Sequence, residues 1–414
     1  MDLGKFTETQ ADDHDVFIFD WTDTLDEEGA IDFSKMERLR AHVPKLPKNF
    51  ARSTILIGEA GGSVAVPLKL KIDWLCLCLD GPAHCVAIEH PIFQSPLKVN
   101  PLIEEVPTRD GFDAMTINAP IGPTMKVWRV QSEKYRQVGL VSSLYGFDDS
   151  PDAEVIAQGI AGKGPDTVSL ARHANFFLWG YSAPPAIMMP AAQRLFVNAI
   201  CYIHKYDGAV PLVRATSRSR EWAIRYSSMA RPVSDEARQK QDEAYREFWT
   251  KLLEKNPERL PGEYKENVAA FIEDRIKSLH ESESRGMELY LPKELREQFG
   301  KDAEKYRKYY EENLEYVRPA GGDAAWFVVD EEAKEIGPSN RKIELLDRCV
   351  AMLERNDHPD LALRILKRYT NTDCESVEQW QAWLNANRSQ LFFSDVGGYK
   401  FFVGPESTST ERAN

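Results

Sequence analysis

Short runs of apolar residues in the first half of the chain predict buried β-strands. The runs are apolar throughout rather than alternating, which is typical of strands covered on both faces of a mainly parallel or mixed sheet. A Gly-Lys-Gly-Pro-Asp segment at residues 162–166 predicts a hairpin turn between two of them. The predicted strands are Asp15–Asp20, Ser53–Gly58, Asp73–Leu79, Lys126–Val130, Gln137–Leu144, Val155–Gln158, Thr167–Ala171 and Asn175–Trp179.

Helical periodicity appears at two places in the same half. The segment Phe33–Val43 predicts one helix. A second helix is predicted at Pro190–Lys205, after the last strand and a loop that begins Gly180-Tyr181-Ser182. A buried strand that feeds such a helix closes an open α/β sheet. We therefore place the end of the first domain near residue 208.

The second half is predominantly helical by its pattern. Between residues 231 and 315 apolar residues recur at helical spacing in a background of Glu, Lys and Arg, which is typical of solvated helical faces. Ser234 is a candidate N-cap. The predicted helices are Asp235–Lys255, Glu263–His280, Asn340–Glu354, Pro359–Tyr369 and Ser376–Asn387, and Leu391–Ser394 with Tyr399–Val403 predict a terminal β-hairpin.

These patterns predict an α/β protein with a mostly α-helical C-terminal half. We divide the chain into an α/β domain at 14–208, a charged helical region at 209–337, a small helical domain with a β-hairpin at 338–404 and a disordered tail at 405–414. The length of 414 residues agrees with two or three domains.

Composition and charge narrow the class of partner. The net charge of −13 argues against a nucleic-acid partner, because duplex binding requires a basic face. The sequence has no stretch of about 18 apolar residues that would span a membrane. The N-terminal residues are acidic and polar, unlike a signal peptide, so we expect a cytoplasmic protein.

Six cysteines in a chain of this length do not make a disulfide framework. Cys201 and Cys349 lie in helical runs and are interpreted as small buried hydrophobes. Cys76, Cys78 and Cys85 cluster, and His84 lies beside the last of them. Such soft ligands suit zinc or another transition metal, although two cysteines spaced by two in a strand also fit a plain core position. No cofactor is favoured.

Two carboxylates follow predicted strands. Asp20 ends the first strand and is followed by Thr22 and Thr24, a pattern that resembles the first motif of haloacid-dehalogenase-type phosphotransferases, where this residue is the nucleophile. Glu59 follows the second strand and is either a general base or a solvated turn residue. We do not assign Gly58, Gly61 and Gly62 to a dinucleotide-binding fingerprint, because we predict no helix directly after this strand.

A third candidate is His90, in the segment His90-Pro91-Ile92. Together with residues 175–180 (NFFLWG) and 195–202 (LFVNAICY), this segment resembles the ThuA-like group, a trehalose-utilisation-like family within the class I glutamine-amidotransferase-like fold. The resemblance covers about residues 14–206. The sequence has Trp179-Gly180-Tyr181 where that family has Leu-Gly-His, and no Cys-His-Glu triad is assembled.

The resemblance implies a flavodoxin-like sheet with a site at the carboxyl ends of its strands. That site would gather Asp20, Glu59, the loop from His84 to His90 and the loop Gly180–Ser182. Residues 380–402 in turn resemble a terminal segment found after helical repeats in multidomain bacterial proteins. We interpret their aromatic residues, among them Trp380 and Trp383, as a packed clamp.

Three functions of different classes remain open. The first is a binding or scaffold protein built on a degenerate amidotransferase-like domain, with an unidentified protein or a small carbohydrate-like ligand as partner. The second is a hydrolase or carbohydrate-modifying enzyme, with His90 or His84 as base and Asp20 or Glu59 as the acid or as the group that orients the base. The third is a metal-dependent enzyme that uses the cysteine cluster.

Overall fold

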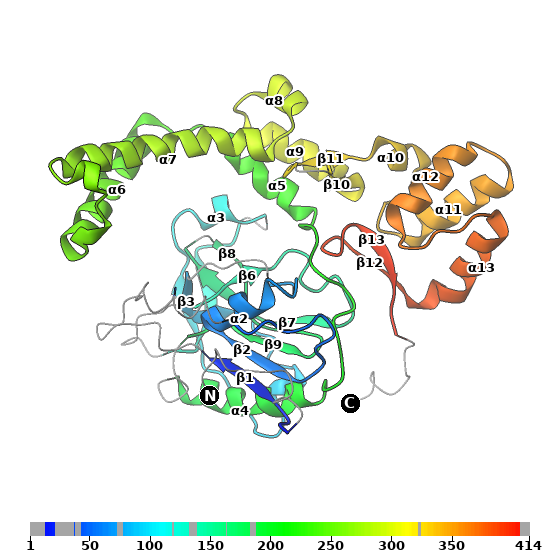
Figure 1. The fold of residues 1–414 in the computed structure, drawn as a ribbon, viewed down its shortest axis with the longest axis horizontal. Coiled ribbons are helices and arrows are strands. Elements are labelled where there is room, and N and C mark those ends of the chain that lie inside the picture. The colour runs from blue at the N-terminus through cyan, green and yellow to red at the C-terminus, as the bar shows by residue number, and fades with distance from the viewer. Residues whose placement is uncertain are drawn as a thin grey trace. The chain divides into compact units, whose positions relative to one another are not determined.

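The protein has an α/β architecture with a mixed sheet in its N-terminal half, helices in its C-terminal half and a closing β-hairpin (Figure 1). The structure is a computed structural model. It describes residues 13–20, 37, 43–72, 78–117, 120–131, 139–162, 164–182, 188–321 and 324–405.

The sheet combines a parallel part with an antiparallel part. Within the described residues its order is β1-β2-β9-β8-β7-β3-β5-β4, with β6 paired to β8. Strands β1, β2 and β9 are mutually parallel, and the pairings from β9 onward are antiparallel. The strands are β1 Phe17–Asp20, β2 Thr54–Ile57, β3 Leu79–His84, β4 Ile103–Pro107, β5 Thr124–Arg129, β6 Ser142–Ser143, β7 Ala153–Ala161, β8 Gly164–His173 and β9 Phe176–Trp179.

Helices cover both faces of the parallel part. Because successive side chains of a strand point to opposite faces, β2 sends Leu56 to one side and Ile55 and Ile57 to the other. Leu56 packs in a core with α2 (Gly58–Ala65), whereas Ile55 and Ile57 pack in a core with α4 (Pro190–His204). All four residues of β2 are buried, which explains why its sequence is apolar throughout.

Two glycines allow neighbouring backbone segments to approach each other closely at the end of β9. A Cβ on Gly180 would lie 2.6 Å from the carbonyl oxygen of Leu140 and 2.9 Å from that of Ser169. A Cβ on Gly139 would lie 2.6 Å from the carbonyl oxygen of Gly180. Gly180 also donates its N–H to the Ser169 carbonyl and accepts from the Leu140 N–H, at 2.8 Å each. These bonds hold the segment after β9 against the sheet.

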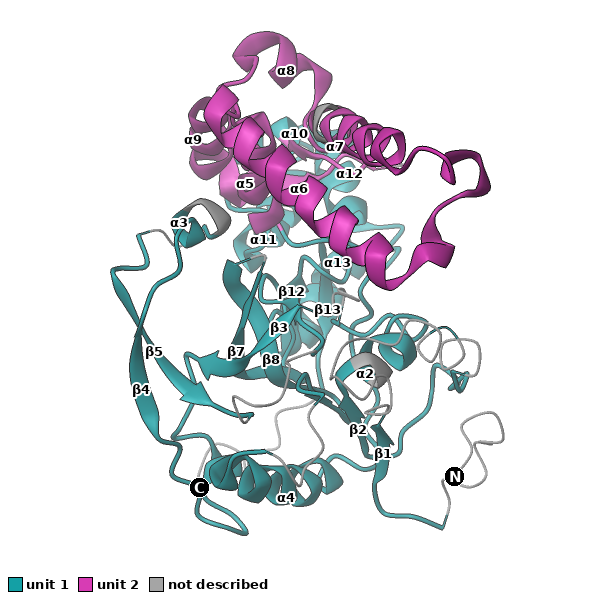
Figure 2. Ribbon diagram, turned by 90° about the vertical axis from the view of Figure 1, so that its left-hand side faces the viewer, with its two compact units in different colours: residues 1–219, 331–414 teal, residues 220–330 magenta. Residues whose placement is uncertain are grey.

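The chain divides into two compact units (Figure 2). The first contains residues 1–219 and 331–414, and the second contains residues 220–330. The helical second unit is therefore an insertion, and the C-terminal helices and hairpin belong to the same unit as the sheet.

The inserted unit is built around two long helices. Its core between α6 and α7 is small and centres on Leu253, Phe271, Ile272 and Ile276. Ser234 caps α6, accepting from the Ala237 N–H, as its sequence predicts. The elements are α5 Glu221–Ser227, α6 Asp235–Lys255, α7 Val268–Tyr290, α8 Lys293–Phe299, α9 Ala303–Asn313, β10 Val317–Pro319 and β11 Phe327–Val329.

The C-terminal part of the first unit consists of four helices and the β12–β13 hairpin. Trp380 is buried and contacts the ring of Trp383, whereas Phe393 contacts Tyr369, Tyr399 and Phe401. The elements are α10 Glu331–Ile336, α11 Ile343–Glu354, α12 Pro359–Tyr369, α13 Val377–Asn387, β12 Leu391–Ser394 and β13 Lys400–Val403.

Several sequence predictions are confirmed and some are wrong. The closing helix and the terminal β-hairpin form as predicted, and β7 and β8 form the predicted hairpin with β8 beginning at Gly164, inside the predicted turn of residues 162–166. A helix, α2, does follow β2 directly, contrary to the prediction, because its glycine-rich start obscures the helical pattern. Cys201 is exposed rather than buried in α4. The predicted helix Phe33–Val43 and most of the strand Asp73–Leu79 fall on residues outside the described ranges.

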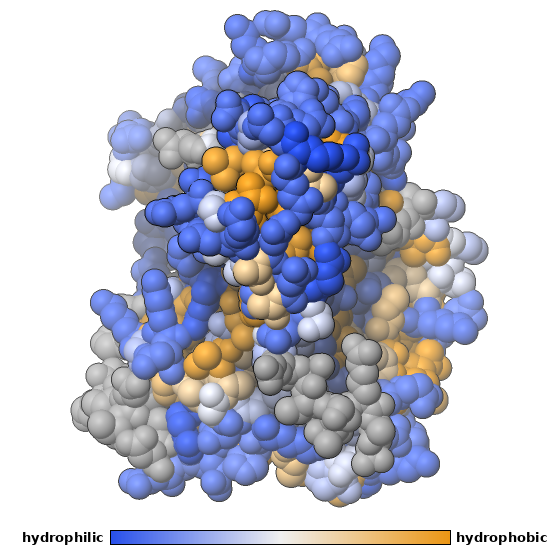
Figure 3. Space-filling model, turned by 90° about the vertical axis from the view of Figure 1, so that its right-hand side faces the viewer, coloured by the Kyte–Doolittle hydropathy of each residue, from blue (hydrophilic) through white to orange (hydrophobic). Residues whose placement is uncertain are grey.

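Hydrophilic side chains separate small apolar areas on the face shown in Figure 3. Exposed large apolar residues occur on both units, for example Leu102 at 73% and Phe248 at 54% exposure. Among the described residues no helix is both long enough and apolar enough to cross a membrane.

The close backbone approach at Gly180 predicts that adding a single methyl group there strongly destabilises the fold. We expect Gly180→Ala to lower the free energy of unfolding by about 2 kcal/mol or more, because its Cβ would meet two backbone oxygens that cannot rotate away. Gly262→Ala is the matched control, since nothing lies within 4 Å of its Cβ position. Urea unfolding of both variants tests this, and equal stability of the two would contradict it.

Candidate functional site

The carboxyl ends of the parallel strands line up at one edge of the sheet. Asp20 of β1 pairs with Ile57 of β2, and Ile57 pairs with Trp179 of β9. Asp20, the start of α2 and the segment Gly180–Ser182 therefore lie at the same edge, as the sequence predicts for a site in an open α/β sheet. Asp20 is exposed. Of Glu59, the structure describes only that its backbone belongs to α2.

The turn from β2 into α2 is made by a glycine. Gly58 has φ of +49°, a left-handed conformation that favours glycine. A Cβ at this position would lie 2.2 Å from the hydroxyl oxygen of Ser182, so this hydroxyl lies directly over the start of the helix. Ser182 is only 6% exposed. The position where a strand-to-helix turn would project a nucleophile therefore carries no side chain.

His90 lies apart from this edge. Its Nε2 donates to Glu154 of β7 over 3.3 Å, its Nδ1 accepts from the Ile92 N–H, and its ring packs edge-on against Tyr202 of α4. Strand β7 is four strands away from β1, a separation of roughly 19 Å. His90 and Asp20 therefore do not lie within hydrogen-bond reach of a common substrate atom.

Glu154 is the centre of the group around His90. Arg172 donates to it over 2.5 Å, and the Tyr202 hydroxyl donates to it as well. Burial by itself raises the pKa of Glu154, but the hydrogen bond from His90 and the charge of Arg172 outweigh it and lower this pKa to about 2. Arg172 also stacks on the ring of Tyr206, 3.8 Å from its centroid. The carboxylate is thus ionised and saturated with donors, which suits a structural role.

Among the residues that the structure describes, the predicted metal ligands form no group of three. His84 ends β3 and donates from Nε2 to the Pro165 carbonyl over 2.8 Å, and burial lowers its pKa. Burial also raises the pKa of the Cys85 thiol, with Asp166 adding to the effect, which disfavours the thiolate that binds metals. Within the described residues no three His, Cys, Asp or Glu side chains lie together as metal ligands. Cys78 is half-buried, and Cys76 lies outside the described residues.

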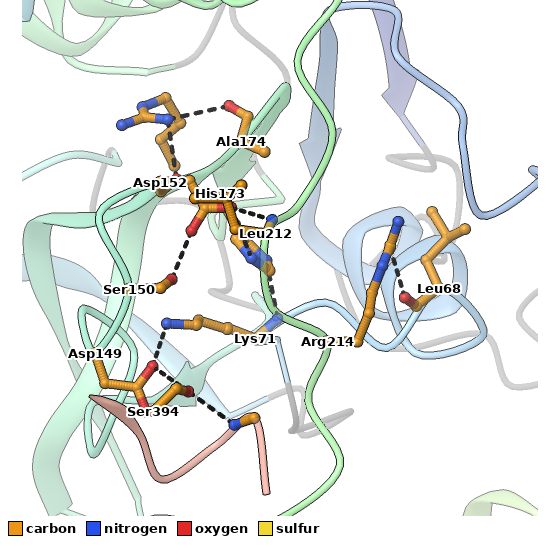
Figure 4. Close-up of polar contacts among 12 residues, drawn as sticks. Leu68, Lys71, Asp149, Ser150, Asp152, His173, Ala174, Leu212, Arg214 and Ser394 are labelled. Atoms are coloured by element: carbon orange, nitrogen blue, oxygen red, sulfur yellow. Dashed lines mark hydrogen bonds and ion pairs between the residues drawn. The ribbon is translucent and has the colours of Figure 1, made fainter. Parts of the chain in front are cut away.

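Sequence reasoning did not identify a buried charged group at the other end of the parallel strands, next to the start of β9 (Figure 4). The Lys71 ammonium is completely buried and contacts the Asp149 carboxylate at 2.5 Å. Asp149 also accepts from the Ser394 hydroxyl and from the Val396 N–H, both at 2.9 Å. Burial raises the pKa of the Asp149 carboxyl, and the Lys71 charge and these hydrogen bonds offset that only in part.

A second carboxylate of the same loop holds the segment that leads to the insertion. Asp152 accepts from the Ser150 hydroxyl at 2.6 Å and from the Leu212 N–H at 2.7 Å. His173, buried beside it, accepts from the Lys71 N–H at Nδ1, which places its proton on Nε2, 3.7 Å from Asp152. We name Lys71, Asp149, Asp152 and His173 the buried charge cluster.

This cluster joins segments that are remote in sequence. It connects the loop after α2, the loop before β7, the end of β8, the segment at residue 212 and the β12–β13 hairpin. Sequence reasoning missed it because its residues lie in unpatterned loops, where a lone Lys or Asp is normally solvated. The closest signal was the polar residues of Asp148–Asp152 immediately before a buried strand.

No family model, no curated protein and no solved structure matches this chain. Its sequence and its own geometry are therefore the basis for a functional assignment.

The buried pair of Lys71 and Asp149 predicts a severe loss of stability when the carboxylate is removed. We expect Asp149→Ala to lower the free energy of unfolding by about 3–5 kcal/mol, because it leaves the Lys71 charge buried and unpaired. The double variant Lys71→Met/Asp149→Ala should recover part of that loss. Glu247→Ala, which breaks the exposed pair with Lys251, should have a far smaller effect, because solvent screens that pair. Chemical denaturation measures all three, and an Asp149→Ala effect as small as that of Glu247→Ala would refute the cluster's role.

Because His173 is buried in its neutral form, we expect the folded state to lose stability in acid. Burial lowers its pKa to about 3, with the charges of Lys71, Arg214 and Arg172 adding to the effect and Asp152 opposing it. An unfolded histidine takes up a proton near pH 6.5, so the unfolded state binds more protons than the folded state between about pH 6.5 and pH 3. This contribution to stability is complete above pH 6.5 and is lost as the pH falls.

We expect His173→Asn, which can retain an acceptor near Nδ1, to flatten the fall in stability between pH 6.5 and pH 4.5. Below that range the lowered pKa of Glu154 adds its own acid lability in both proteins. His358→Asn, at an exposed site, should leave the pH dependence as it is. Melting temperatures across the pH range provide the measurement, and an unchanged slope in His173→Asn would contradict the assignment.

Proposed function

We propose that this chain is a non-catalytic binding or scaffold protein, built on a ThuA-like, amidotransferase-like α/β domain whose catalytic side chains are replaced. The observation that carries the proposal is the turn at Gly58. In nucleophile-elbow enzymes this strained strand-to-helix turn presents the reactive side chain. Here it carries a glycine, and Ser182 packs over it.

The surroundings of the predicted catalytic histidines support the proposal. His90 is bound to Glu154 and packed on Tyr202, and His84 is bound to a backbone carbonyl. A general base must reach both the nucleophile and a proton of the substrate. Histidines engaged in this way serve packing and hydrogen bonding instead.

The position of the helical insertion supports a scaffold role in particular. Residues 212–217, which lead into the insertion, are bound to the α/β domain. The N–H groups of Thr216 and Ser217 donate to the Val396 carbonyl, and the Leu212 N–H donates to Asp152. Val396, between β12 and β13, is itself fixed by Asp149. The α/β domain, its C-terminal helices and the hairpin thus form one unit that carries residues 220–330 as an insertion.

A hydrolase remains the alternative, and one observation favours it. Asp20 and the Gly180–Ser182 segment do lie at the same edge of the sheet, where enzymes of open α/β folds place their sites. A hydrolase would show substrate turnover that depends on Asp20, whereas a binding or scaffold protein would show none.

The test is an activity panel on the full chain. We expect no ammonia release from glutamine and no hydrolysis of chromogenic esters, phosphate esters or glycosides above the buffer rate. Asp20→Asn and Ser182→Ala are the paired variants, and Gly262→Ala is the matched control. Turnover in the wild type that Asp20→Asn or Ser182→Ala abolishes and Gly262→Ala retains would overturn the binding function and establish the hydrolase.

A further inference from the structure

We propose that helix α6 of the inserted unit is a self-association surface, on which α6 of a second copy of this chain packs in antiparallel orientation. The two copies would be related by a twofold axis that passes close to Phe248. The inference goes beyond the scaffold function and does not rest on it, because a hydrolase is equally able to form this dimer. It is carried by the burial, the spacing and the charge order of α6.

Helix α6 buries very little of its own surface. It has 21 residues, and Leu253 is the one among them that is buried. The core that α6 shares with α7 lies near the end of α6, around Leu253 and Phe271, whereas Ala237 and Ala244 in its first half are exposed. In proteins a helix is stabilised mainly by packing one of its faces against another element. A second packing partner would therefore stabilise α6.

The exposed side of α6 carries the spacing of a coiled coil. A set of residues recurs alternately four and three positions apart, which keeps them on one side of the helix. The large apolar member is Phe248, which is 54% exposed, and two members are alanines, whose small side chains let another helix approach closely. We name these residues the α6 seam: Ala237, Gln241, Ala244, Phe248, Lys251 and Lys255.

The α6 seam lies on a different side of the helix from the contact with α7. Asp242 pairs with His280 of α7 at 2.8 Å, and Arg246 pairs with Glu273 of α7 at 2.7 Å. At 3.6 residues per turn, Asp242 and Arg246 lie roughly 120° and 160° around the helix from Phe248. A second copy that packs on the seam therefore leaves the contact between α6 and α7 in place.

The ring of Phe248 is held in position although it is exposed. It stacks on Tyr245, with ring centroids 6.4 Å apart, and meets Trp249 edge-on at 5.7 Å. Trp249 in turn meets Phe271 of the α6–α7 core edge-on at 5.3 Å. A rigid aromatic residue is a favourable anchor for an interface, because little conformational freedom is lost when it is covered.

The order of charges along α6 favours a second copy in antiparallel orientation. Five acidic and three basic residues of α6 precede Phe248, whereas two basic residues and one acidic residue follow it. An antiparallel copy brings the acidic first part of one helix against the basic last part of the other. With the axis beside Phe248, Glu247 of each copy comes level with Lys251 of the other. A surface that complements itself in this way fits a twofold dimer.

The first test is sedimentation velocity of the full chain over a wide range of concentrations. We expect a reversible equilibrium between monomer and dimer. Phe248→Ala should weaken the association about tenfold or more, because it removes the central aromatic anchor. Val268→Ala is the matched control, since Val268 is another apolar residue of the inserted unit, with 40% exposure, and it should associate like the wild type.

A charge exchange tests the antiparallel orientation. Glu247→Lys and Lys251→Glu should each weaken self-association about tenfold, because like charges then face each other across the axis. A mixture of the two variants should form a heterodimer with nearly the affinity of the wild type, because every pair across the axis again has opposite charges. Circular dichroism of each variant checks that the helices remain intact.

Three outcomes would overturn the proposal. A wild type that stays monomeric at every concentration shows that another partner, or none, covers the α6 seam. A dimer that Phe248→Ala leaves as strong as before has its interface elsewhere. Charge variants that do not recover association when mixed exclude the antiparallel arrangement. All three are independent of the activity panel, so this proposal and the scaffold function fail separately.

Discussion

The burial of the Lys71 ammonium is the constraint on which the arrangement of the first unit depends. A charge with no exposed surface is tolerated only when it is paired and hydrogen-bonded. Asp149 meets that requirement, and because it also accepts from Ser394 and Val396, the same carboxylate binds the C-terminal hairpin to the sheet. A chain segment almost 250 residues away is thereby made part of the α/β unit.

The two edges of the sheet have different chemistry. At the amino ends of the parallel strands, charged groups such as Glu154 and Arg172 are paired with one another, so their charges are satisfied internally. At the carboxyl ends, Ser182 packs over the glycine turn that leads from β2 into α2.

His90 shows the limit of reasoning from a motif. The segment His90-Pro91-Ile92 points to a functional loop by its resemblance, and its proline does begin a short 3-10 helix that His90 caps. What the motif cannot give is the partner of the imidazole. The partner is Glu154, 64 residues away, and its position follows from the antiparallel pairing of β7 with β8, which no local pattern specifies.

The sequence by itself determined those elements whose burial on one or both faces imposes a period that can be read directly, and it missed α2, α3 (Phe112–Met115) and β4. It predicted α6 to the residue, the closing helix α4 and the terminal hairpin. It also predicted that Asp20 and Gly180–Ser182 share an edge, since parallel strands end together. The tertiary structure alone decided the pairing of Lys71 with Asp149 and the position of Ser182 over Gly58. Both depend on contacts between distant segments, whose energies exist only once the chain is folded.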